Sequence, residues 1–500
     1  MFRIPLIPML THQQTETKPY HGCFLWVVLL LAARCVVMPF MPLADPTEGR
    51  YALIAREMVV SGDWITPRLW MDGQKVPFLG KPPLYFWCSA ACMKLFGINE
   101  FAARLPGILS FAIMLLMVWA VLRRYTSEEI GWRAVFLILS SAVLFVASGV
   151  VIVDMMVTMA VTGALFSFFA FTRENNSSVR RRWSLLIFVM LALGFMTKGP
   201  VVIVLFGLPV ILWAMWFKRW QMILAQEWYW GITLFAAITV PWFVLAEQRN
   251  PGFLRYFFVN ENFLRFVVHE YGDKYGSGHE HIRGTAIWMM LAAAVPWSIY
   301  ILYRLFEERQ HLSFKSLLSY EGTSLFLCIF AANTLFWGMA RQLLIAYLFP
   351  AVPAFAAWLS MLISRWPCLK AQTDPIFKKT SIVIGWCIIL AILISIPLTA
   401  HHSTKYIIKK ARTISGGKQY GLYFIRRIPY SAYFYDSSAV IAHPTESLEK
   451  SLNYDHENNP FFYITEKKYW TGMPDSYRQT VSVLAEGGKY ILYDAPRKAR

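Results

Sequence analysis

The sequence predicts a polytopic α-helical membrane protein with a small α/β domain outside the membrane. Of its 500 residues, 57% are hydrophobic and 16% are charged, whereas charged residues make up roughly a quarter of a soluble domain. Apolar runs of about 20 residues, each long enough to cross the hydrocarbon core of a bilayer, recur as far as residue 398. Beyond that point, short alternating runs between polar turns indicate strands.

The apolar runs predict about 11–13 transmembrane helices, of which eleven can be placed on the sequence. The expected spans are 24–41, 105–122, 134–150, 153–171, 183–197, 200–217, 230–247, 285–303, 323–339, 343–363 and 380–398. The run 83–96 is too short to cross and is expected to lie in the interface or dip into it. We therefore expect a transmembrane domain over 1–399 and an outer domain over 400–500.

In the tail, four alternating stretches are expected to be strands: GLYFI, SAYFYD, PFFYIT and KYILYDA. The seven cysteines form no CxxC pair, so no disulfide framework or zinc motif is predicted.

The short loops predict the orientation. Basic residues fill every second loop, as the positive-inside rule requires of cytoplasmic loops. These residues are Arg123, Arg124 and Arg133; Arg173 and Arg180–Arg182; Lys218 and Arg219; Arg304 and Arg309; and Arg365, Lys370, Lys378 and Lys379. The N-terminus is then cytoplasmic and the C-terminal domain lies outside. Topology and anionic headgroups explain the net charge of +18 better than nucleic acid does.

This topology gathers the unusual polar residues at the outer face. They are the long loop 42–104, Asp154, Lys198, the loop 248–284, Arg341 and Tyr347. A one-sided cluster predicts a site that faces the outer compartment. A transporter would instead place polar residues near the middle of the bilayer, often in paired halves.

The stretch LADPTEGRYALIAREMVVSGDW (43–64) follows the first span. Asp45 as N-cap, Pro46 at the first helical position and Glu48 three residues after the cap resemble a capping box. The helix that follows is expected to be amphipathic and to lie along the membrane. The two carboxylates then either only start this helix or also serve as a base or orient an acceptor.

Three further charged residues lie close to predicted span ends. Lys81, before Pro82 and Pro83, sits on a rigid turn from which its ammonium can reach a lipid phosphate. Asp154 lies among apolar residues, and a buried ionisable residue in a membrane indicates function because its burial is costly. Lys198 ends the fifth span. The alternative for Lys81 is an ordinary interface lysine. For Asp154 it is a position in a short loop between two spans, and for Lys198 a position in a tight turn.

The loop 248–284 and the segment ARQLLIAYLFP (340–350) complete the candidates. The loop offers Arg255, Arg265, His269, Asp273, His279 and His281. His269, His279 and His281 are weak candidates for a divalent metal, and no metal site is predicted from them. Arg341 and Tyr347 either bind a ligand or anchor the span at the interface.

At these residues the chain resembles the GT-C membrane glycosyltransferases that use polyprenyl-phosphate sugars, in particular the lipid A aminoarabinose transferase and protein O-mannosyltransferase-like group. The resemblance is carried by DPTEGRYALIAREMVVSGDWITPRL, GKPPLYFW, LFGINEFAARLP, MTKGP, YFFVNENFLRF and the Arg341/Tyr347 segment. It implies an active site on the periplasmic side of a bacterial inner membrane.

The resemblance also implies roles. Asp45 or Glu48 would assist the acceptor, and Asp154 matches a second acidic position. The donor-binding set would be Arg50, Lys81, Lys198, Arg265, Arg341 and Tyr347. The chain departs from its relatives at three positions: Thr47 where Asp is frequent, Gly80 where Glu is frequent, and Asn262 where some have His.

The function expected from the resemblance is inverting transfer of a sugar from a polyprenyl (undecaprenyl) phosphate to lipid A or a related glycolipid. The alternatives are the same donor chemistry on protein Ser/Thr or another glycan, and a transporter or flippase. The expected partners are the lipid donor, the outer-leaflet acceptor and membrane lipids. No Walker or dinucleotide-binding motif is present.

Overall fold

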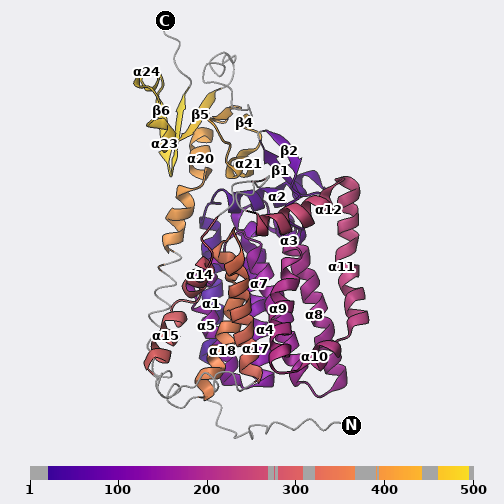
Figure 1. Cartoon of the computed structure of the whole chain (residues 1–500). Coiled ribbons are helices and arrows are strands. Elements are labelled where there is room, and N and C mark those ends of the chain that lie inside the picture. Colours follow the sequence, from indigo (N-terminus) through magenta and orange to yellow (C-terminus); the bar gives the residue numbers. More distant parts are fainter. Residues whose placement is uncertain are drawn as a thin grey trace.

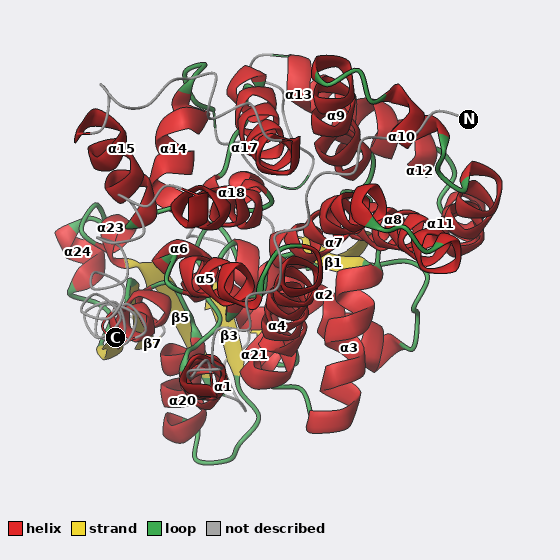
Figure 2. Ribbon diagram, turned by 90° about the horizontal axis from the view of Figure 1, so that it is seen from below, coloured by secondary structure: helices red, strands yellow, loops and turns green. Residues whose placement is uncertain are grey.

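The computed structural model describes residues 21–71, 73–268, 275, 280–307, 321–365, 390, 393–441 and 460–494. Long helices form a bundle, and a small sheet domain stands on one end of it (Figure 1). Seen along the bundle, the helices surround the central pair α4 and α7 (Figure 2). The predicted fold class is therefore confirmed.

The first half of the bundle comprises α1 (His21–Val37), η1 (Met38–Phe40), α2 (Thr47–Ser61), the hairpin β1 (Arg68–Met71) and β2 (Gln74–Pro77), α3 (Leu84–Phe96), α4 (Glu100–Tyr125), α5 (Glu128–Leu139), α6 (Ala142–Ser148), α7 (Asp154–Arg173), α8 (Ser177–Lys198) and α9 (Val201–Trp216). The rest comprises α10 (Trp220–Leu224), α11 (Trp228–Arg249), α12 (Phe253–Arg255), η2 (Tyr256–Leu264), α13 (Arg265–Val267), α14 (Thr285–Ala293), α15 (Trp297–Glu307), α17 (Glu321–Met339), η3 (Ile345–Leu348) and α18 (Ala351–Arg365).

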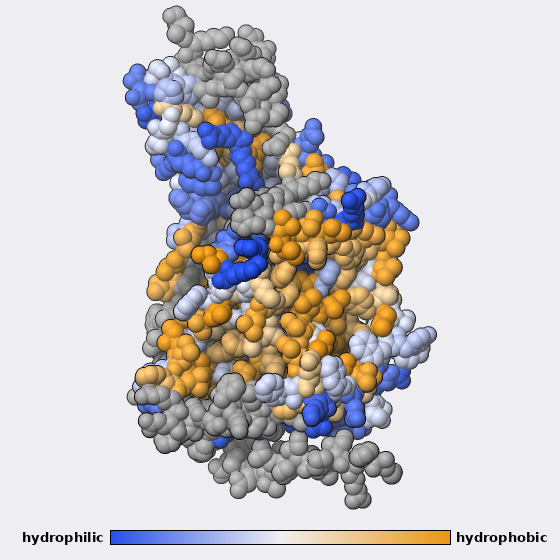
Figure 3. All heavy atoms as spheres, viewed as in Figure 1, coloured by the Kyte–Doolittle hydropathy of each residue, from blue (hydrophilic) through white to orange (hydrophobic). Residues whose placement is uncertain are grey.

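Among the described residues, four helices are long and apolar enough to cross a membrane: α4, α7, α11 and most of α17. Two bent helix pairs raise the number to six if each pair counts as one span, and shorter apolar helices lie over 24–40, 84–96, 201–216 and 351–365. On the face seen in Figure 3, hydrophobic side chains cover the middle of the bundle between more polar ends. The first ten predicted spans each coincide with a helix or a helix pair, and 380–398 lies largely outside the described residues.

Two of the predicted spans are not continuous, which corrects the expectation for 134–150 and 285–303. The axes of α5 and α6 differ by 75°, and those of α14 and α15 differ by 103°. Ser141 Oγ donates to the Leu137 carbonyl at the first break. Pro296 lies at the second break, where it cannot donate the backbone bond that would continue the helix.

An arginine in the first helix binds the C-terminal end of α6, the second helix of the bent pair α5 and α6. Arg34 is fully buried, and its Nη2 donates to the Val146 carbonyl of α6 over 2.7 Å. A Cβ on Gly149 would lie 2.2 Å from Arg34 Nε, so glycine leaves the room that the guanidinium occupies. The C-terminal end of α6 thus receives a cation, which its helix dipole favours.

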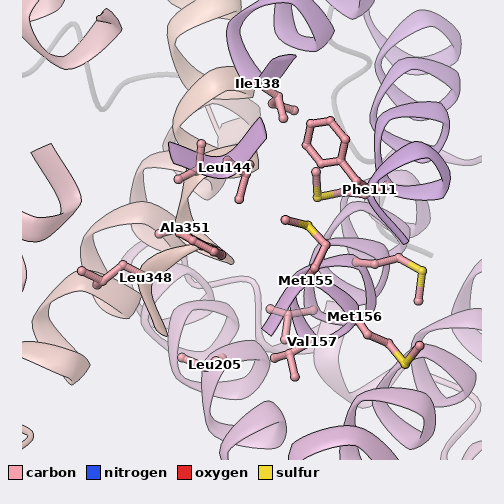
Figure 4. Close-up of a cluster of buried hydrophobic side chains, with 14 of the residues drawn as sticks. Phe111, Ile138, Leu144, Met155, Met156, Val157, Leu205, Leu348 and Ala351 are labelled. Carbon is pink, nitrogen blue, oxygen red and sulfur yellow. The ribbon is translucent and has the colours of Figure 1, made fainter. Parts of the chain in front are cut away.

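The apolar core lies at the centre of the bundle (Figure 4). Phe111 of α4 packs in one cluster with residues of α5, α6, α7 and the later helices. The labelled members are Ile138, Leu144, Met155, Met156, Val157, Leu205, Leu348 and Ala351. Because α7 is buried along almost its whole length, it forms the fixed axis from which Asp154 projects.

The helix that follows the first span differs from its prediction. Nearly every residue from Tyr51 to Met58 of α2 is buried, whereas an interfacial helix would expose a polar face. The cause is a cover on both sides: α2 packs on α3 and also against α21 (Tyr430–Asp436) of the C-terminal region. The short run 83–96 forms α3, as expected.

The C-terminal region contains a five-stranded sheet in the order β4-β3-β5-β7-β6. Its elements are α20 (Lys405–Ile414), β3 (Gly421–Phe424), α21, β4 (Val440–Ile441), β5 (Phe461–Glu466), α23 (Lys467–Trp470), α24 (Asp475–Arg478), β6 (Val483–Gly487) and β7 (Tyr490–Asp494). Three of the four predicted strands are confirmed. SAYFYD is wrong: it forms helix α21, which buries Tyr433 and Phe434.

The loops are grouped at the two ends of the bundle as predicted. Arg124 contacts Glu174 over 2.8 Å, and Arg181 contacts Glu227 over 3.6 Å, which joins three loops predicted to be cytoplasmic. At the other end, Arg249 contacts Asp63 of the first outer loop over 2.9 Å. Which end faces which compartment stays a prediction.

Candidate active site

The start of α2 is held by the C-terminal region. Asp45 does not cap the helix, which begins at Thr47 without a side-chain cap; its Oδ1 accepts from the Ser431 amide over 3.0 Å and its Oδ2 from the Ser431 hydroxyl. Burial raises the pKa of Asp45 to about 6, although the bonds from Ser431 oppose this. Asp45 thus ties α2 to α21, and the predicted N-cap is wrong.

Glu48 does not complete the predicted capping box either, because its Oε2 accepts from the Ala44 amide over 3.0 Å, while the Asp45 amide donates to the His402 carbonyl over 3.1 Å. Glu48 also binds Arg104 of α4, whose Nε and Nη2 lie 2.8 and 2.9 Å from its two oxygens. Glu48 Oε1 accepts in addition from the Val151 amide over 3.0 Å. Its carboxylate is therefore engaged on both oxygens.

Arg104 is fully buried and uses its remaining donors on backbone carbonyls. These are the carbonyls of Met38, Met41 and Pro42. The pair Arg104–Glu48 joins the end of the first helix, the start of α2, α4 and the turn before α7. With their oxygens bound inside the protein, Asp45 and Glu48 fit positioning better than proton transfer.

A second carboxylate, Asp154, lies at the first position of α7 and is 8% exposed. Its Oδ1 accepts from Nζ of Lys198, the last residue of α8. The same ammonium lies 3.7 Å from the centre of the Tyr347 ring, close enough for a cation–π interaction. Three residues predicted for the site are thus in contact.

Lys81 forms a second charged group with the loop after α11. Its Nζ donates to the Gly80 carbonyl over 2.8 Å and to Glu261 Oε1. Arg265 Nη1 donates to the same Glu261 oxygen over 2.8 Å, and its Nε donates to Gln342 over 2.8 Å. Burial lowers the pKa of Lys81, but Glu261 raises it, and the net change is upward.

The two groups converge at Tyr347. The charges of Arg265, Asp154 and Lys81 all act on its phenol, which also faces Lys198. Tyr51 of α2 interacts with Lys81 and Lys198. These side chains come from α2, the turn before α3, α7, α8, η2, α13 and η3. Segments far apart in the sequence therefore build one cluster.

Arg50 lies next to this cluster. Its Nη1 donates to the Tyr275 carbonyl over 2.9 Å, and its guanidinium carbon is 5.1 Å from the centre of the Tyr51 ring. Tyr275 is itself fixed by bonds of its hydroxyl with the Leu79 amide and the Pro77 carbonyl, both over 2.9 Å. Arg50 is thereby held beside the turn that carries Lys81.

Arg341 directly precedes Gln342. Its Nε is buried and has no hydrogen-bond partner among the described residues, and its carbonyl accepts from the His281 amide over 3.1 Å. His281 is exposed. His269, Asp273 and His279 lie outside the described residues. Within the described part of the chain, no three His, Cys, Asp or Glu side chains are grouped as metal ligands.

The sequence reasoning assigned no role to Glu261 or Arg104. For Glu261 a signal existed: FVNENFLRF places it four residues before Arg265, the spacing of a helical ion pair. For Arg104 the signal was a charge inside an apolar helix, which requires a partner. Neither pattern names the partner from another segment.

The fold is similar to two crystal structures of ArnT from Cupriavidus metallidurans. For the structure bound to undecaprenyl phosphate, the TM-score is 0.74 at 18% identity, covering 96% of this chain and 99% of that chain. For the apo structure it is 0.70 at 18% identity, covering 94% and 98%. The chain therefore has the GT-C membrane glycosyltransferase fold.

Sequence comparison agrees with this class. Residues 41–257 match the family described as dolichyl-phosphate-mannose-protein mannosyltransferase. The undecaprenyl phosphate-alpha-4-amino-4-deoxy-L-arabinose arabinosyl transferase of Erwinia tasmaniensis is 27% identical over 63% of this chain and 54% of its own length. Transferase 1 of that name from Proteus mirabilis is 29% identical over 72% and 62%.

These comparisons confirm the predicted resemblance: the chain is a membrane protein similar to the aminoarabinose transferases. The match to them is partial, because it spans 54% of the relative from Erwinia tasmaniensis and 62% of that from Proteus mirabilis.

Proposed function

We propose that this protein is an inverting glycosyltransferase that moves a sugar from a polyprenyl (undecaprenyl) phosphate to lipid A or a related glycolipid. We place the reaction at the outer face of a bacterial inner membrane, with the N-terminus cytoplasmic and the C-terminal domain periplasmic. The named activity of the relatives supports this proposal. So does the convergence of cations around Tyr347.

The observation that carries the proposal is the pair of partly buried cations Lys81 and Arg265, which meet on one oxygen of Glu261. Cleavage of the bond between the anomeric carbon and the phosphate oxygen leaves the electron pair on that oxygen. Fixed cations at this point stabilise the charge as it develops and need no reorganisation during the reaction. Lys81 and Arg265 are already held together by Glu261. Lys198 lies against the ring of Tyr347.

We assign the phosphate to Lys81 and Arg265, with Arg50 and Arg341 beside them, and Tyr347 as a hydroxyl donor. Lys198 then orients Asp154. Asp154 is the carboxylate best placed to orient the acceptor or take its proton, because Asp45 and Glu48 are engaged by Ser431 and Arg104. We assign those two carboxylates to positioning α2.

The acceptor is proposed on chemical grounds. A phosphate acceptor is already anionic and needs no strong base, whereas a hydroxyl acceptor must lose a proton. Thr47, where the resemblance to the family leads us to expect Asp, favours either a phosphate acceptor or a base supplied from another position. Direct displacement by that oxygen inverts the anomeric centre.

Protein Ser/Thr is the second candidate acceptor, because residues 41–257 match a family described as a protein mannosyltransferase. The donor half of the site would be the same. The two candidates differ in the fate of the sugar, which appears either on lipid A or on protein.

The test is mass spectrometry of lipid A from cells with and without the gene, complemented by wild type, Asp154→Asn or Lys81→Met at matched expression. We expect one sugar mass to disappear in the deletion, to return with wild type and to stay absent with either variant. Identical lipid A in all strains overturns the lipid A acceptor, and glycoprotein analysis of the same strains then tests protein Ser/Thr.

A further inference from the structure

One carboxylate oxygen holds two of the cations that the proposed donor site needs. Glu261 Oε1 accepts from both Lys81 and Arg265. The side chains of Glu261, Lys81 and Arg265 are 5%, 14% and 20% exposed, so water screens this contact little. Any phosphate that binds the two cations shares them with Glu261.

The backbone fixes Glu261 in this position. It lies in η2, a π-helix over Tyr256–Leu264, and π-helical turns are rare and frequent at functional sites. Asn262 Nδ2 donates to the Phe257 carbonyl over 2.8 Å, within the same widened turn. Phe257 is fully buried, which anchors the segment.

Part of the positive charge of the site is offset within it. Lys81 and Arg265 share the one negative charge of Glu261, and Lys198 is paired with Asp154, while Arg50 and Arg341 lie beside them. A site built only to bind phosphate would leave out the carboxylate between its two cations. Glu261 therefore weakens anion binding at the point where the phosphate is expected.

The proposed reaction gives such a carboxylate a use. The donor is a phosphodiester with one negative charge, while the lipid product is a phosphate monoester whose second ionisation lies near neutral pH. The monoester therefore carries more negative charge than the diester. Unopposed cations would hold the product more tightly than the donor and slow its release.

We propose that Glu261 is a specificity residue that competes with lipid phosphate for Lys81 and Arg265, and thereby weakens binding of the monoester product more than binding of the diester donor. This inference rests on the proposed function. Glu261 acts through the two cations and touches no reacting atom.

The test measures binding of two soluble probes to the purified protein in detergent: farnesyl phosphate, a monoester, and farnesyl methyl phosphate, a diester. In Glu261→Gln we expect the monoester to bind about tenfold tighter, since charges a few ångströms apart interact strongly at low screening. The diester should gain less, so the ratio of the two dissociation constants shifts toward the monoester.

Steady-state kinetics with a polyprenyl-phosphate sugar provide an independent measurement. Glu261→Gln should lower both kcat and KM, with stronger inhibition by the monoester. Glu261→Asp keeps the charge and should keep the wild-type ratio of dissociation constants. Glu486→Gln, an exposed carboxylate of the C-terminal region paired with Lys467, is the matched control.

The outcomes separate the inference from the proposed function. If wild type binds neither probe, the donor site itself is wrong. If wild type binds both probes and Glu261→Gln weakens both equally, Glu261 only orients the cations and the inference is overturned. If Glu261→Gln does not fold, Glu261→Ala replaces it: a ratio of dissociation constants shifted toward the monoester supports the inference, and an unchanged ratio overturns it.

Discussion

Two buried groups of ion pairs lie near α2, and their hydrogen bonds are distributed differently. In the pair Arg104–Glu48, the guanidinium donates to Glu48 and to three carbonyls, and the carboxylate accepts from two backbone amides as well. In the cluster around Tyr347, Lys198 instead faces an aromatic ring and one carboxylate. The first arrangement holds backbone segments together, while the second directs charge toward one side chain.

The comparison teaches that burial of a charge does not by itself indicate a binding site. What distinguishes the two groups is where the hydrogen bonds of each charge end. Besides Glu48, Arg104 donates to three backbone carbonyls, so the pair fixes the geometry of the backbone. The described contacts of Lys81, Arg265 and Lys198 include side-chain oxygens of Glu261 and Asp154, and an added anion can join such contacts.

The largest effect is expected for Arg104→Met, which leaves Glu48 buried without its cation. We expect a loss of about 3–5 kcal/mol of stability, as for other broken buried ion pairs. Thermal unfolding of the purified protein in detergent measures it. The double variant Arg104→Met/Glu48→Gln should recover part of the loss. If Arg104→Met were as stable as wild type, the pair Arg104–Glu48 would have no structural role that sets it apart from the cluster around Tyr347.

Lys81→Met should act on the reaction instead. We expect sugar transfer to fall by about 100-fold or more, as when one preorganised donor to a developing charge is removed. The unfolding temperature should change much less than in Arg104→Met, because Glu261 keeps its contact with Arg265. An in vitro transfer assay with Lys81→Arg as the charge-preserving control measures this. Activity close to wild type would contradict the donor-site assignment.

Asp45 tests the link between α2 and the C-terminal region through pH. Its pKa is raised from 3.8 to about 6, mainly by burial, so between these values the folded state keeps a proton that the unfolded state releases. Its contribution to stability therefore falls as pH rises from about 4 to 6, and then stays constant.

In Asp45→Asn this dependence should disappear. The difference in free energy of unfolding between wild type and the variant should shift in the variant's favour by about 2 kcal/mol from pH 4.5 to pH 7. Unfolding curves at both pH values measure this. Parallel pH dependence of the two proteins would show that Asp45 is not protonated in the folded state near pH 5.

The smallest effect is expected for an exposed pair at the other end of the bundle. Arg124 contacts Glu174 over 2.8 Å, but its side chain is 55% exposed. Arg124→Ala should cost less than about 1 kcal/mol, the usual range of surface ion pairs, and should leave transfer unchanged. A loss of stability as large as that of Arg104→Met would mean that burial does not decide how much an ion pair contributes to the stability of this protein.

Much of the fold was predictable because a membrane imposes one strong rule, a long apolar run for each span. Breaks inside spans were harder to predict: Pro296 is a visible signal, but the two serines at 140 and 141 are compatible with a continuous helix. The prediction for SAYFYD was wrong because a run of six residues with several aromatics fits both a strand and one face of a short helix.

The candidate site was likewise predictable where local patterns were enough, and not where distant segments meet. Lys81, Lys198, Asp154 and Tyr347 were selected from local patterns, and the structure brings them together. Glu261 was missed because its partner Lys81 is 180 residues away in the sequence. Local patterns show which residues are unusual, and only the fold shows which of them meet.

The buried arginine of the first helix has a consequence for biogenesis. An arginine at the centre of a transmembrane helix costs about 2.5–3.5 kcal/mol on the scale measured for the translocon, and this is an upper bound for Arg34, which lies in the last turn of α1. The carbonyl that receives Arg34 belongs to Val146, 112 residues later, and it is synthesised only after α4 and α5. The first helix therefore reaches its final environment late, so its integration depends on helices that leave the ribosome after it.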